Sequence, residues 1–437
     1  MRAWRKKEAD AARPGRRLLG LTDTGAPLFE PRPSHSLLYA PAGAGKTTCG
    51  VMPWLLSMLA DPSRALVITD SKNGELAAQA AGLAAAFGRK VALIDDTGVL
   101  GRTHPLRIEL AATGSILAAA ARGDGSLIFA TDNAAHALIP EPTNDQKNQY
   151  FRDGPRSLIE FAALVLLKRS PRLATPGGLW STLADPAALK RLTRIEAEEG
   201  EAQLAALARS LVDLAEHTPD HWAQHLQAAL KALRIYAAGS ALHEAGLDAS
   251  LTHADLLREG YVTFLIGPVQ HMERLGAHYG LHLQSFLDAL YQGIPGRVDF
   301  ILEEVTNAPL KRLVSALTTM RGFGGSCHFV VQSRSELIRA FGERETETVE
   351  ENAIVKQWFG FGSFAEAERI AKAIGEEFVL QEGLGLTSAN LGVSHNYSKT
   401  RAPILAAEAL LAMGAETQLV HVKGVGFLKA RKIAQHQ

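Results

Sequence analysis

A glycine-rich loop near the start of the chain constrains its fold more than any other feature. Residues 40–47 read Ala-Pro-Ala-Gly-Ala-Gly-Lys-Thr and follow the apolar run Ser36–Ala40. They match the phosphate-loop pattern G-x-x-x-x-G-K-[ST], with Ala40 in place of the first glycine. Apolar residues at helical spacing follow over residues 51–59. This strand, loop and helix order is the context that the motif requires, and it predicts an α/β fold of the P-loop NTPase class.

Each residue type in the loop has a chemical reason. Gly43 and Gly45 allow backbone N–H groups to turn toward phosphate oxygens. Lys46 reaches the β- and γ-phosphates, the Thr47 hydroxyl is a magnesium ligand, and the helix N-terminus adds the positive end of its dipole. We therefore expect ATP and Mg²⁺ as cofactors. The residues expected to bind the nucleotide are contiguous: Ala42, Gly43, Ala44, Gly45, Lys46, Thr47 and Thr48.

A second strand pattern ends in two acids. The apolar run Val298–Leu302 is followed directly by Glu303 and Glu304. Open parallel sheets bind ligands at the carboxyl ends of their strands. A phosphate-loop ATPase needs one carboxylate there for Mg²⁺, and many use a second to polarise the attacking water. We assign Glu303 to the metal, together with Thr47, and Glu304 to the general base. The alternative is a strand that ends in solvated acids.

Two further residues are candidates for catalysis. The strand pattern His328–Gln332 ends in Gln332, which can sense the γ-phosphate and orient the water. Its alternative role is a strand-end cap. Arg321 lies between the expected helix Leu310–Met320 and a glycine-rich turn. It is a candidate arginine finger acting on the nucleotide of a neighbouring subunit, with an ordinary surface arginine as the alternative.

Short apolar or β-branched runs recur along the chain, and most are separated by Ala- and Leu-rich segments of helix length. They are Ser36–Ala40, Ala65–Asp70, Val91–Asp95, Tyr261–Ile266, Val298–Leu302, His328–Gln332 and Ile354–Phe361. This alternation predicts a mostly parallel central sheet with helices on both faces. Asp70–Glu75 and Asp95–Asp96 close two of these runs. They either line the nucleotide crevice or cap the following helices.

The middle of the chain has helical periodicity and hardly any strand pattern. We therefore predict an all-α domain over residues 144–249. It is inserted into a nucleotide-binding domain made of residues 35–143 and 250–437. Residues 1–34 form a basic N-terminal segment. Its first 20 residues are either a solvated tail or a patch that contacts anionic lipid or a membrane partner.

Composition excludes several classes of protein. The formal net charge is zero, which excludes coating of nucleic acid by bulk attraction but not a local basic channel. Lys311, Arg312, Arg334 and Arg339 are candidate phosphate contacts in such a channel, or scattered surface charge. The two cysteines, Cys49 and Cys327, exclude a disulfide scaffold and a cysteine-based zinc site, and they fit a reducing compartment. No apolar stretch is long enough for a transmembrane helix.

With these residues in place, the chain resembles the type IV coupling proteins of bacterial conjugation and type IV secretion, the TraG/TraD group. The resemblance runs from about Gly20 to the C-terminus. Phe300–Val305 stands where the family has apolar residues followed by Asp-Glu, so Glu303 replaces the usual Asp. The other similar segments are Val51–Leu56 (family V-x-P-x-L-L), Ile68–Leu76 (Y-D-P-K-G-E-L, with Asn73 inserted), Thr263–Pro268, Val331–Ser333 (x-Q-S) and Gly360–Ser363.

The resemblance implies a RecA-like ATPase with an inserted all-α domain, assembled as a homo-hexamer. It implies recruitment of relaxase, relaxosome or secreted effector proteins. It also implies transfer of single-stranded DNA, alone or with protein, to inner-membrane secretion-channel components. Arg321 falls where the family places its trans arginine finger. The expected location is cytoplasmic, at the inner membrane of a bacterium. Family members usually begin with a transmembrane domain, so we expect a naturally soluble member or a truncated form.

Two other functions fit parts of the sequence. A duplex-DNA motor of the FtsK or HerA type shares the core chemistry but does not explain the long helical insert. A nucleotide-gated docking scaffold would use the helical domain to recruit cargo and would turn over too slowly to pump. Stimulation of ATP hydrolysis by DNA separates a motor from a scaffold.

Overall fold

The structure is a computed structural model that describes residues 15–141, 148–304, 310–387 and 392–433. Its centre is an 11-stranded sheet in the order β2-β1-β13-β12-β9-β3-β8-β7-β4-β6-β5. The seven strands from β9 to β5 are parallel, and they are the seven runs that the sequence predicts. They are β3 (Ser36–Tyr39), β4 (Arg64–Asp70), β5 (Val91–Ile94), β6 (Val262–Ile266), β7 (Arg297–Glu303), β8 (Gly325–Val331) and β9 (Val355–Trp358).

Four antiparallel strands extend one side of the sheet, and the sequence analysis did not predict them. Strand β12 pairs with β9 and with β13, and β13 pairs with β1, which pairs with β2. Part of the predicted N-terminal segment therefore belongs to the sheet. These strands are β1 (Leu18–Leu21), β2 (Pro27–Phe29), β12 (Thr417–Val422) and β13 (Gly426–Arg431).

Helices cover both faces of the sheet, because alternate side chains along the buried strands point to opposite faces. Leu38 packs with α2 (Met52–Leu59) and α3 (Glu75–Ala86). Leu37 and Tyr39 belong to the core on the other face. Outside the helical insert, the helices that contribute to this second core are α11 (His253–Arg258), α12 (Met272–Tyr291), α13 (Lys311–Ala316), α14 (Arg334–Phe341), α15 (Glu343–Asn352), α16 (Phe364–Ile374) and α17 (Ala407–Leu411). This is the predicted mixed α/β fold.

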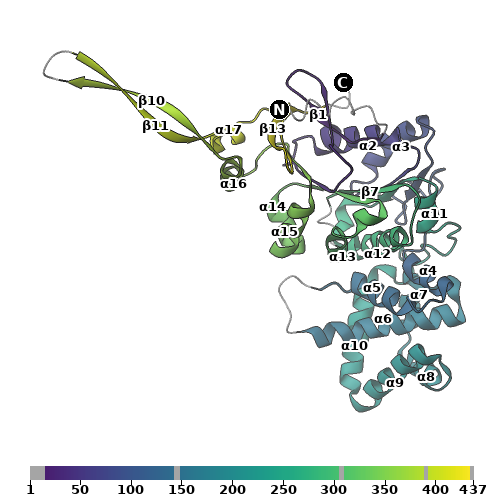
Figure 1. Ribbon diagram of the computed structural model, residues 1–437. Coiled ribbons are helices and arrows are strands. Elements are labelled where there is room, and N and C mark those ends of the chain that lie inside the picture. The colour runs from purple at the N-terminus through teal and green to yellow at the C-terminus, as the bar shows by residue number, and fades with distance from the viewer. Residues whose placement is uncertain (1–14, 142–147, 305–309, 388–391, 434–437) are drawn as a thin grey trace.

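The chain between β5 and α11 forms the helical insert, at the bottom of Figure 1. Its apolar core is continuous with the core under the sheet, and α12 packs against α4 and α5. The first helix of the insert, α4, begins at Gly114, so the insert starts before the predicted limits 144–249. The insert comprises α4 (Gly114–Arg122), α5 (Leu127–Leu138), α6 (Gln149–Arg169), η3 (Pro171–Leu173), α7 (Pro176–Leu183), α8 (Pro186–Glu199), α9 (Ala202–His217), α10 (Pro219–Ala232) and η4 (Arg234–Tyr236).

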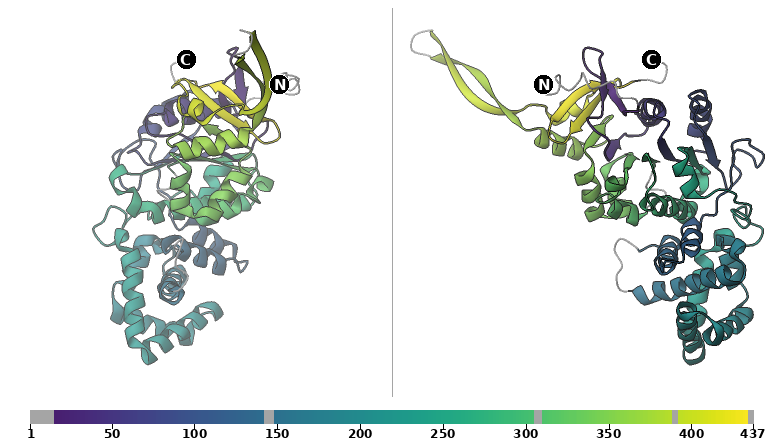
Figure 2. Two further views of the ribbon diagram at one scale, coloured as in Figure 1. Left: turned by 90° about the vertical axis from the view of Figure 1, so that its left-hand side faces the viewer. Right: turned by 45° about the vertical axis from the view of Figure 1, so that its right-hand side comes forward.

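A long antiparallel hairpin, β10 (Glu376–Thr387) with β11 (Gly392–Pro403), projects away from the body (Figure 1, and Figure 2, right). It forms a two-stranded sheet of its own. An isolated two-stranded ribbon is marginally stable in water. None of the described helices is both long enough and apolar enough to span a bilayer.

Candidate nucleotide-binding site

The phosphate loop has the backbone that its glycines predict. Gly43 and Gly45 have φ angles of 75° and 83°, in the left-handed region that favours glycine. The N–H of Ala44 donates to the carbonyl of Pro41 at 3.0 Å, which closes the turn. A π-helical turn, η2 (Lys46–Val51), then leads into α2. Such turns occur frequently at functional sites.

Strand β7 brings its two acids directly to this loop. The Thr47 hydroxyl donates to Glu303 Oε1 at 2.5 Å, and Lys46 Nζ forms an ion pair with Glu304 Oε1. The side chain of Glu303 is 3% exposed and that of Glu304 is 18% exposed. The two candidate metal ligands, Thr47 and Glu303, are therefore in contact. The candidate base lies beside the phosphate-binding lysine.

A second lysine, Lys72, also reaches the acids, although the sequence analysis did not assign it to the site. Its Nζ lies 3.4 Å from Glu303 Oε1 and 3.7 Å from Glu304 Oε1. Burial lowers the pKa of Lys72, but the two carboxylates outweigh burial and raise it above its ordinary value. The available signal was its place just after β4, which pairs with β7 in parallel.

Glu304 has an unusual backbone for a glutamate. Its φ is 52°, and its N–H donates to the carbonyl of Val330 at 3.1 Å. A left-handed conformation at a non-glycine residue costs about 1–3 kcal/mol and is common at functional sites. The turn aims Glu304 away from the strand direction, so two consecutive acids face the same site.

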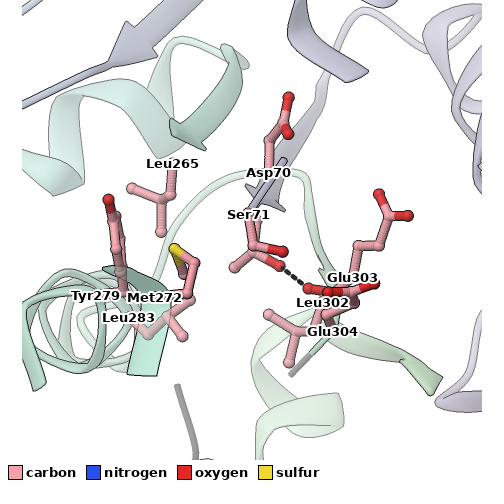
Figure 3. A pocket seen from close by; sticks show the side chains of 10 residues that line it. Asp70, Ser71, Leu265, Met272, Tyr279, Leu283, Leu302, Glu303 and Glu304 are labelled. Carbon is pink, nitrogen blue, oxygen red and sulfur yellow. Dashed lines mark hydrogen bonds between the residues drawn. The ribbon is translucent and has the colours of Figure 1, made fainter. Parts of the chain in front are cut away.

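The acids adjoin a small cavity, which Figure 3 shows from close by. Asp70 and Ser71 lie on one side of it, and Tyr279 and Met272 of α12 lie on the other. Asp70 also accepts hydrogen bonds from the N–H groups of Ala77 and Lys72, at 2.8 and 3.2 Å. Burial raises the pKa of Asp70. Asp70 therefore both lines the crevice and fixes the start of α3.

Gln332 lies between the phosphate loop, which follows β3, and the acids at the end of β7. It directly follows β8, which pairs with β3 on one side and with β7 on the other. Its backbone N–H donates to Glu336 at 3.3 Å, and its side chain is half-buried. The side-chain cap of α14 comes from Ser333, which accepts from the N–H of Glu336. Since Ser333 provides the cap, the side chain of Gln332 is not needed for that role.

Lys432 supports the loop from the far end of the chain, a contact that the sequence analysis missed. Its Nζ donates to the carbonyl of Ala44 at 3.1 Å and to that of Phe359 at 2.9 Å. It also lies 4.7 Å from the centre of the Phe359 ring, and the residue is 4% exposed. Burial lowers its pKa. No local pattern reveals this contact, because 388 positions separate Lys432 from Ala44.

Arg321 does not lie at the nucleotide site of its own chain. It is exposed on η7 (Met320–Phe323), just before β8 begins. The loop and acids follow the carboxyl ends of β3 and β7, whereas Arg321 precedes the amino end of a parallel neighbour. It therefore lies at the opposite edge of the sheet. Its charge acts instead on His35, whose pKa burial chiefly lowers to about 4.

Two of the candidate DNA-contacting residues are engaged elsewhere. Arg312 pairs with Asp288 at 3.0 Å, and Arg334 pairs with Glu343 and Glu350 at 2.8 and 3.1 Å. The two pairs of Arg334 give the acidic helix α15 a structural role. Lys311 is half-buried and Arg339 is exposed.

A family model described as type IV secretory system conjugative DNA transfer matches residues 6–437. The VirD4 proteins of Rhizobium rhizogenes and Agrobacterium fabrum are 24% identical over 420 residues. Each alignment covers 91% of this chain and 58% of the relative, so the chain spans less than two thirds of their length.

Solved structures show the same fold. The unbound conjugative coupling protein TrwB has a TM-score of 0.68 at 15% identity, covering 99% of this chain and 93% of that one. TrwB in complex with ADP and Mg²⁺ has a TM-score of 0.66 at 15% identity, covering 98% and 92%. VirB4 of Thermoanaerobacter pseudethanolicus has a TM-score of 0.56 at 13% identity, covering 97% and 98%. At these identities the likeness is one of fold.

Proposed function

The chain belongs to the type IV secretory system conjugative DNA transfer family, and from this premise we propose that it is an ATP-driven coupling protein. In this role it recruits relaxase, relaxosome or effector proteins and moves single-stranded DNA, alone or with protein, toward inner-membrane channel components. The observation that carries the proposal is the meeting of Lys46 and Thr47 with Glu303 and Glu304 at one sheet edge. A phosphate loop alone serves binding, whereas hydrolysis also needs the carboxylates.

Each residue of this edge has a role in hydrolysis. Glu304 accepts the proton of the attacking water on a carboxylate oxygen, and Gln332 orients that water. Lys46 pairs with Glu304. When Lys46 moves onto the phosphates, this ion pair opens and Glu304 acts as the base. Lys72 keeps a positive charge beside both acids.

The residues fit a nucleotide with Mg²⁺. Magnesium prefers oxygen ligands, and Thr47 Oγ1 and Glu303 Oε1 already lie together at the end of the loop. The positive φ angles of Gly43 and Gly45 fit a loop that wraps phosphate. Bound Mg²⁺ would neutralise charge on the phosphates. Glu303 is one methylene longer than the aspartate that the family usually has at this position. The ion pair of Lys46 is with Glu304.

We propose that Arg321 acts between subunits of a homo-hexamer. Its position at the far edge of the sheet prevents contact with the nucleotide of its own chain. Its exposure leaves it accessible to a neighbour. An arginine supplied in trans stabilises transition-state charge and accounts for about 10³–10⁵ in rate in related systems. The chemistry would then require the assembled ring.

The helical insert is the proposed cargo-recruiting domain, because it forms one end of the molecule (Figure 2). The apolar core of the insert continues into the core under the sheet, which includes α12. Movement of α12 during the nucleotide cycle would therefore reach the insert. The family places this work at the cytoplasmic face of the bacterial inner membrane, where we propose that this chain acts.

The test is the ATPase rate with and without single-stranded DNA, measured together with the mass in solution with ATP. The Glu304→Gln variant is the control for background hydrolysis. Hydrolysis stimulated by single strands in a ring supports the motor. Stimulation by duplex alone indicates a duplex motor, and ATP binding with cargo capture but without stimulated turnover indicates a docking scaffold.

A further inference from the structure

A second cluster of titratable side chains lies at the end of β5, outside the nucleotide site. His278 Nε2 and His282 Nε2 lie 2.9 and 3.0 Å from the same oxygen, Asp96 Oδ2. One ligand atom from each residue lies within 4.8 Å of the other two. All three side chains are buried, at 1%, 0% and 3% exposure for His278, His282 and Asp96. None of them has a role in the chemistry proposed above.

The sequence explains why these donors converge. His278 and His282 are four positions apart on α12, so both rings leave the same face of one helix. Asp96 follows β5 at the carboxyl edge of the sheet, next to Asp95. Asp95 accepts the N–H groups of Val99 and Leu100, at 2.9 and 2.7 Å. This turn holds the backbone that presents Asp96 to α12.

Each histidine has a second partner that fixes its ring. Tyr236 OH lies 3.3 Å from Nδ1 of His278, and His253 Nε2 lies 3.0 Å from Nδ1 of His282. Metal-bound histidines almost always use their other ring nitrogen in such a contact, which sets the tautomer and the orientation. The ring of His253 packs closely against Gly114, where an added Cβ would lie 2.4 Å from its Nδ1, so a glycine is needed there to leave room for the ring.

One carboxylate oxygen of the cluster has no partner. In the described part of the chain the ion-pair contacts of Asp96 are with the two histidines, and its Oδ1 is buried without a hydrogen-bond partner. A buried polar atom left without a partner is costly, and a cation bound here would supply one.

We propose that Asp96, His278 and His282 bind one divalent transition-metal ion, Zn²⁺, as a structural site. Two imidazole nitrogens and a carboxylate are a zinc ligand set, and Asp96 Oδ1 can join Oδ2 on the metal as the second oxygen of a bidentate carboxylate. At Zn–ligand distances of about 2.0–2.1 Å, donors from different residues of a near-tetrahedral site lie about 3.3 Å apart. Each histidine nitrogen therefore needs to move away from Asp96 Oδ2 by a few tenths of an ångström. Nitrogen ligands disfavour Mg²⁺, so the magnesium used for hydrolysis does not compete.

The site ties together parts of the chain that are distant in sequence. Asp96 ends a strand of the sheet, and the two histidines belong to α12, which packs against the insert. Their outer partners are Tyr236 in η4 and His253 in α11. A metal ion here fixes the insert relative to the nucleotide-binding sheet. The site does not depend on whether the chain is a motor.

The first experiment measures metal content of the full chain, purified without a metal-affinity tag. We expect about one equivalent of zinc per chain by elemental analysis after growth in zinc-containing medium. His278→Gln and His282→Gln should lose it, and His225→Gln should keep it. His225 is the matched control because it is an equally buried histidine, 1% exposed, in the insert. His253→Ala should weaken zinc affinity about 10-fold, the lower end for an outer partner.

The second experiment uses only the wild-type chain, so it stands even where a variant fails to fold. The chelator-stripped protein is titrated with Co²⁺ alone and then with Zn²⁺. One equivalent of Co²⁺ should give the strong visible absorption of a tetrahedral site, and Zn²⁺ should displace it. Chelation should lower the thermal midpoint. A chain that holds no zinc, or that gives only the weak octahedral Co²⁺ spectrum, overturns the proposal. Zinc retained by both the His278 and the His282 variant overturns it equally.

Discussion

Two strands of the same parallel sheet end in consecutive acids, and the two pairs have opposite surroundings. Glu303 ends β7 and Glu304 follows it. The two acids meet Lys46, Thr47 and Lys72, and Glu304 is partly open to solvent. Asp95 and Asp96 follow β5, but Asp95 holds a turn and Asp96 is buried among histidines. In sequence both pairs are simply acids after an apolar run.

The difference shows what a strand-end position determines. It places a carboxylate at the ligand-binding edge of the sheet. The neighbouring strand and the covering helix then supply its partners. The acids of β7 find their partners on the phosphate loop, which follows β3, two strands away in the sheet. Asp96 after β5 finds its partners on α12. Lysines and a hydroxyl suit phosphate and magnesium, whereas imidazoles suit a transition metal.

The largest expected effect is at the β7 end. Lys46→Ala should abolish ATP hydrolysis and leave the fold intact, because its one polar side-chain contact in the described structure is with Glu304. Steady-state ATPase assays and circular dichroism test this. A variant that unfolds, or one that hydrolyses ATP at the normal rate, contradicts the assignment of the loop.

Arg321→Ala should bind nucleotide normally but lose about 10³-fold or more in turnover, because an arginine finger acts in trans. Mixing it with Lys46→Ala subunits is decisive. Some interfaces of a mixed ring pair an intact Lys46 site with an intact Arg321, so activity should partly return. Mixed rings that demonstrably form and stay inactive would show that Arg321 is structural or acts within its own subunit.

The two acids of β7 should separate by phenotype. Glu304→Gln should bind ATP but lose about 10²–10⁴-fold in turnover, the contribution of a general base. Glu303→Gln should instead weaken the dependence on Mg²⁺ and the binding of ATP, since Glu303 contacts the Thr47 hydroxyl. Magnesium titrations of both variants measure the difference. Exchanged phenotypes would mean that the two roles are assigned in the wrong order.

The parallel sheet was predictable because each of its strands is a short buried run flanked by helix-forming sequence. The loop residues were predictable because phosphate chemistry demands particular residue types at fixed spacing. Strands β12 and β13 were missed, although Thr417–Val422 and Gly426–Arg431 pair across a short turn. Their position beside β9 depends on long-range pairing, which periodicity does not encode.

The candidate site was only partly predictable for a related reason. The role of Lys72 depends on the turn that follows it, where Asn73 has a φ of 57° and its Oδ1 accepts from the N–H of Val269 at 3.0 Å. The His-x-x-x-His spacing of His278 and His282 was readable. That they face Asp96 follows only from the packing of α12 on the sheet.

The smallest expected effect concerns Lys432, which supports the phosphate loop beside the acids of β7. Its ammonium group bridges the carbonyls of Ala44 and Phe359, so Lys432→Met leaves both without this charged donor. Hydrogen bonds to charged groups contribute about 1.5–3 kcal/mol each at most. The loop should become less well ordered, and ATP affinity should fall about 10-fold with little change in turnover at saturation.

Calorimetric binding of a non-hydrolysable ATP analogue measures this change in affinity. Lys429→Met is the control, because Lys429 is exposed on β13, the strand that Lys432 directly follows, and it should leave affinity unchanged. Equal affinities for both variants and the wild type would mean that Lys432 stabilises the C-terminal strands without ordering the loop.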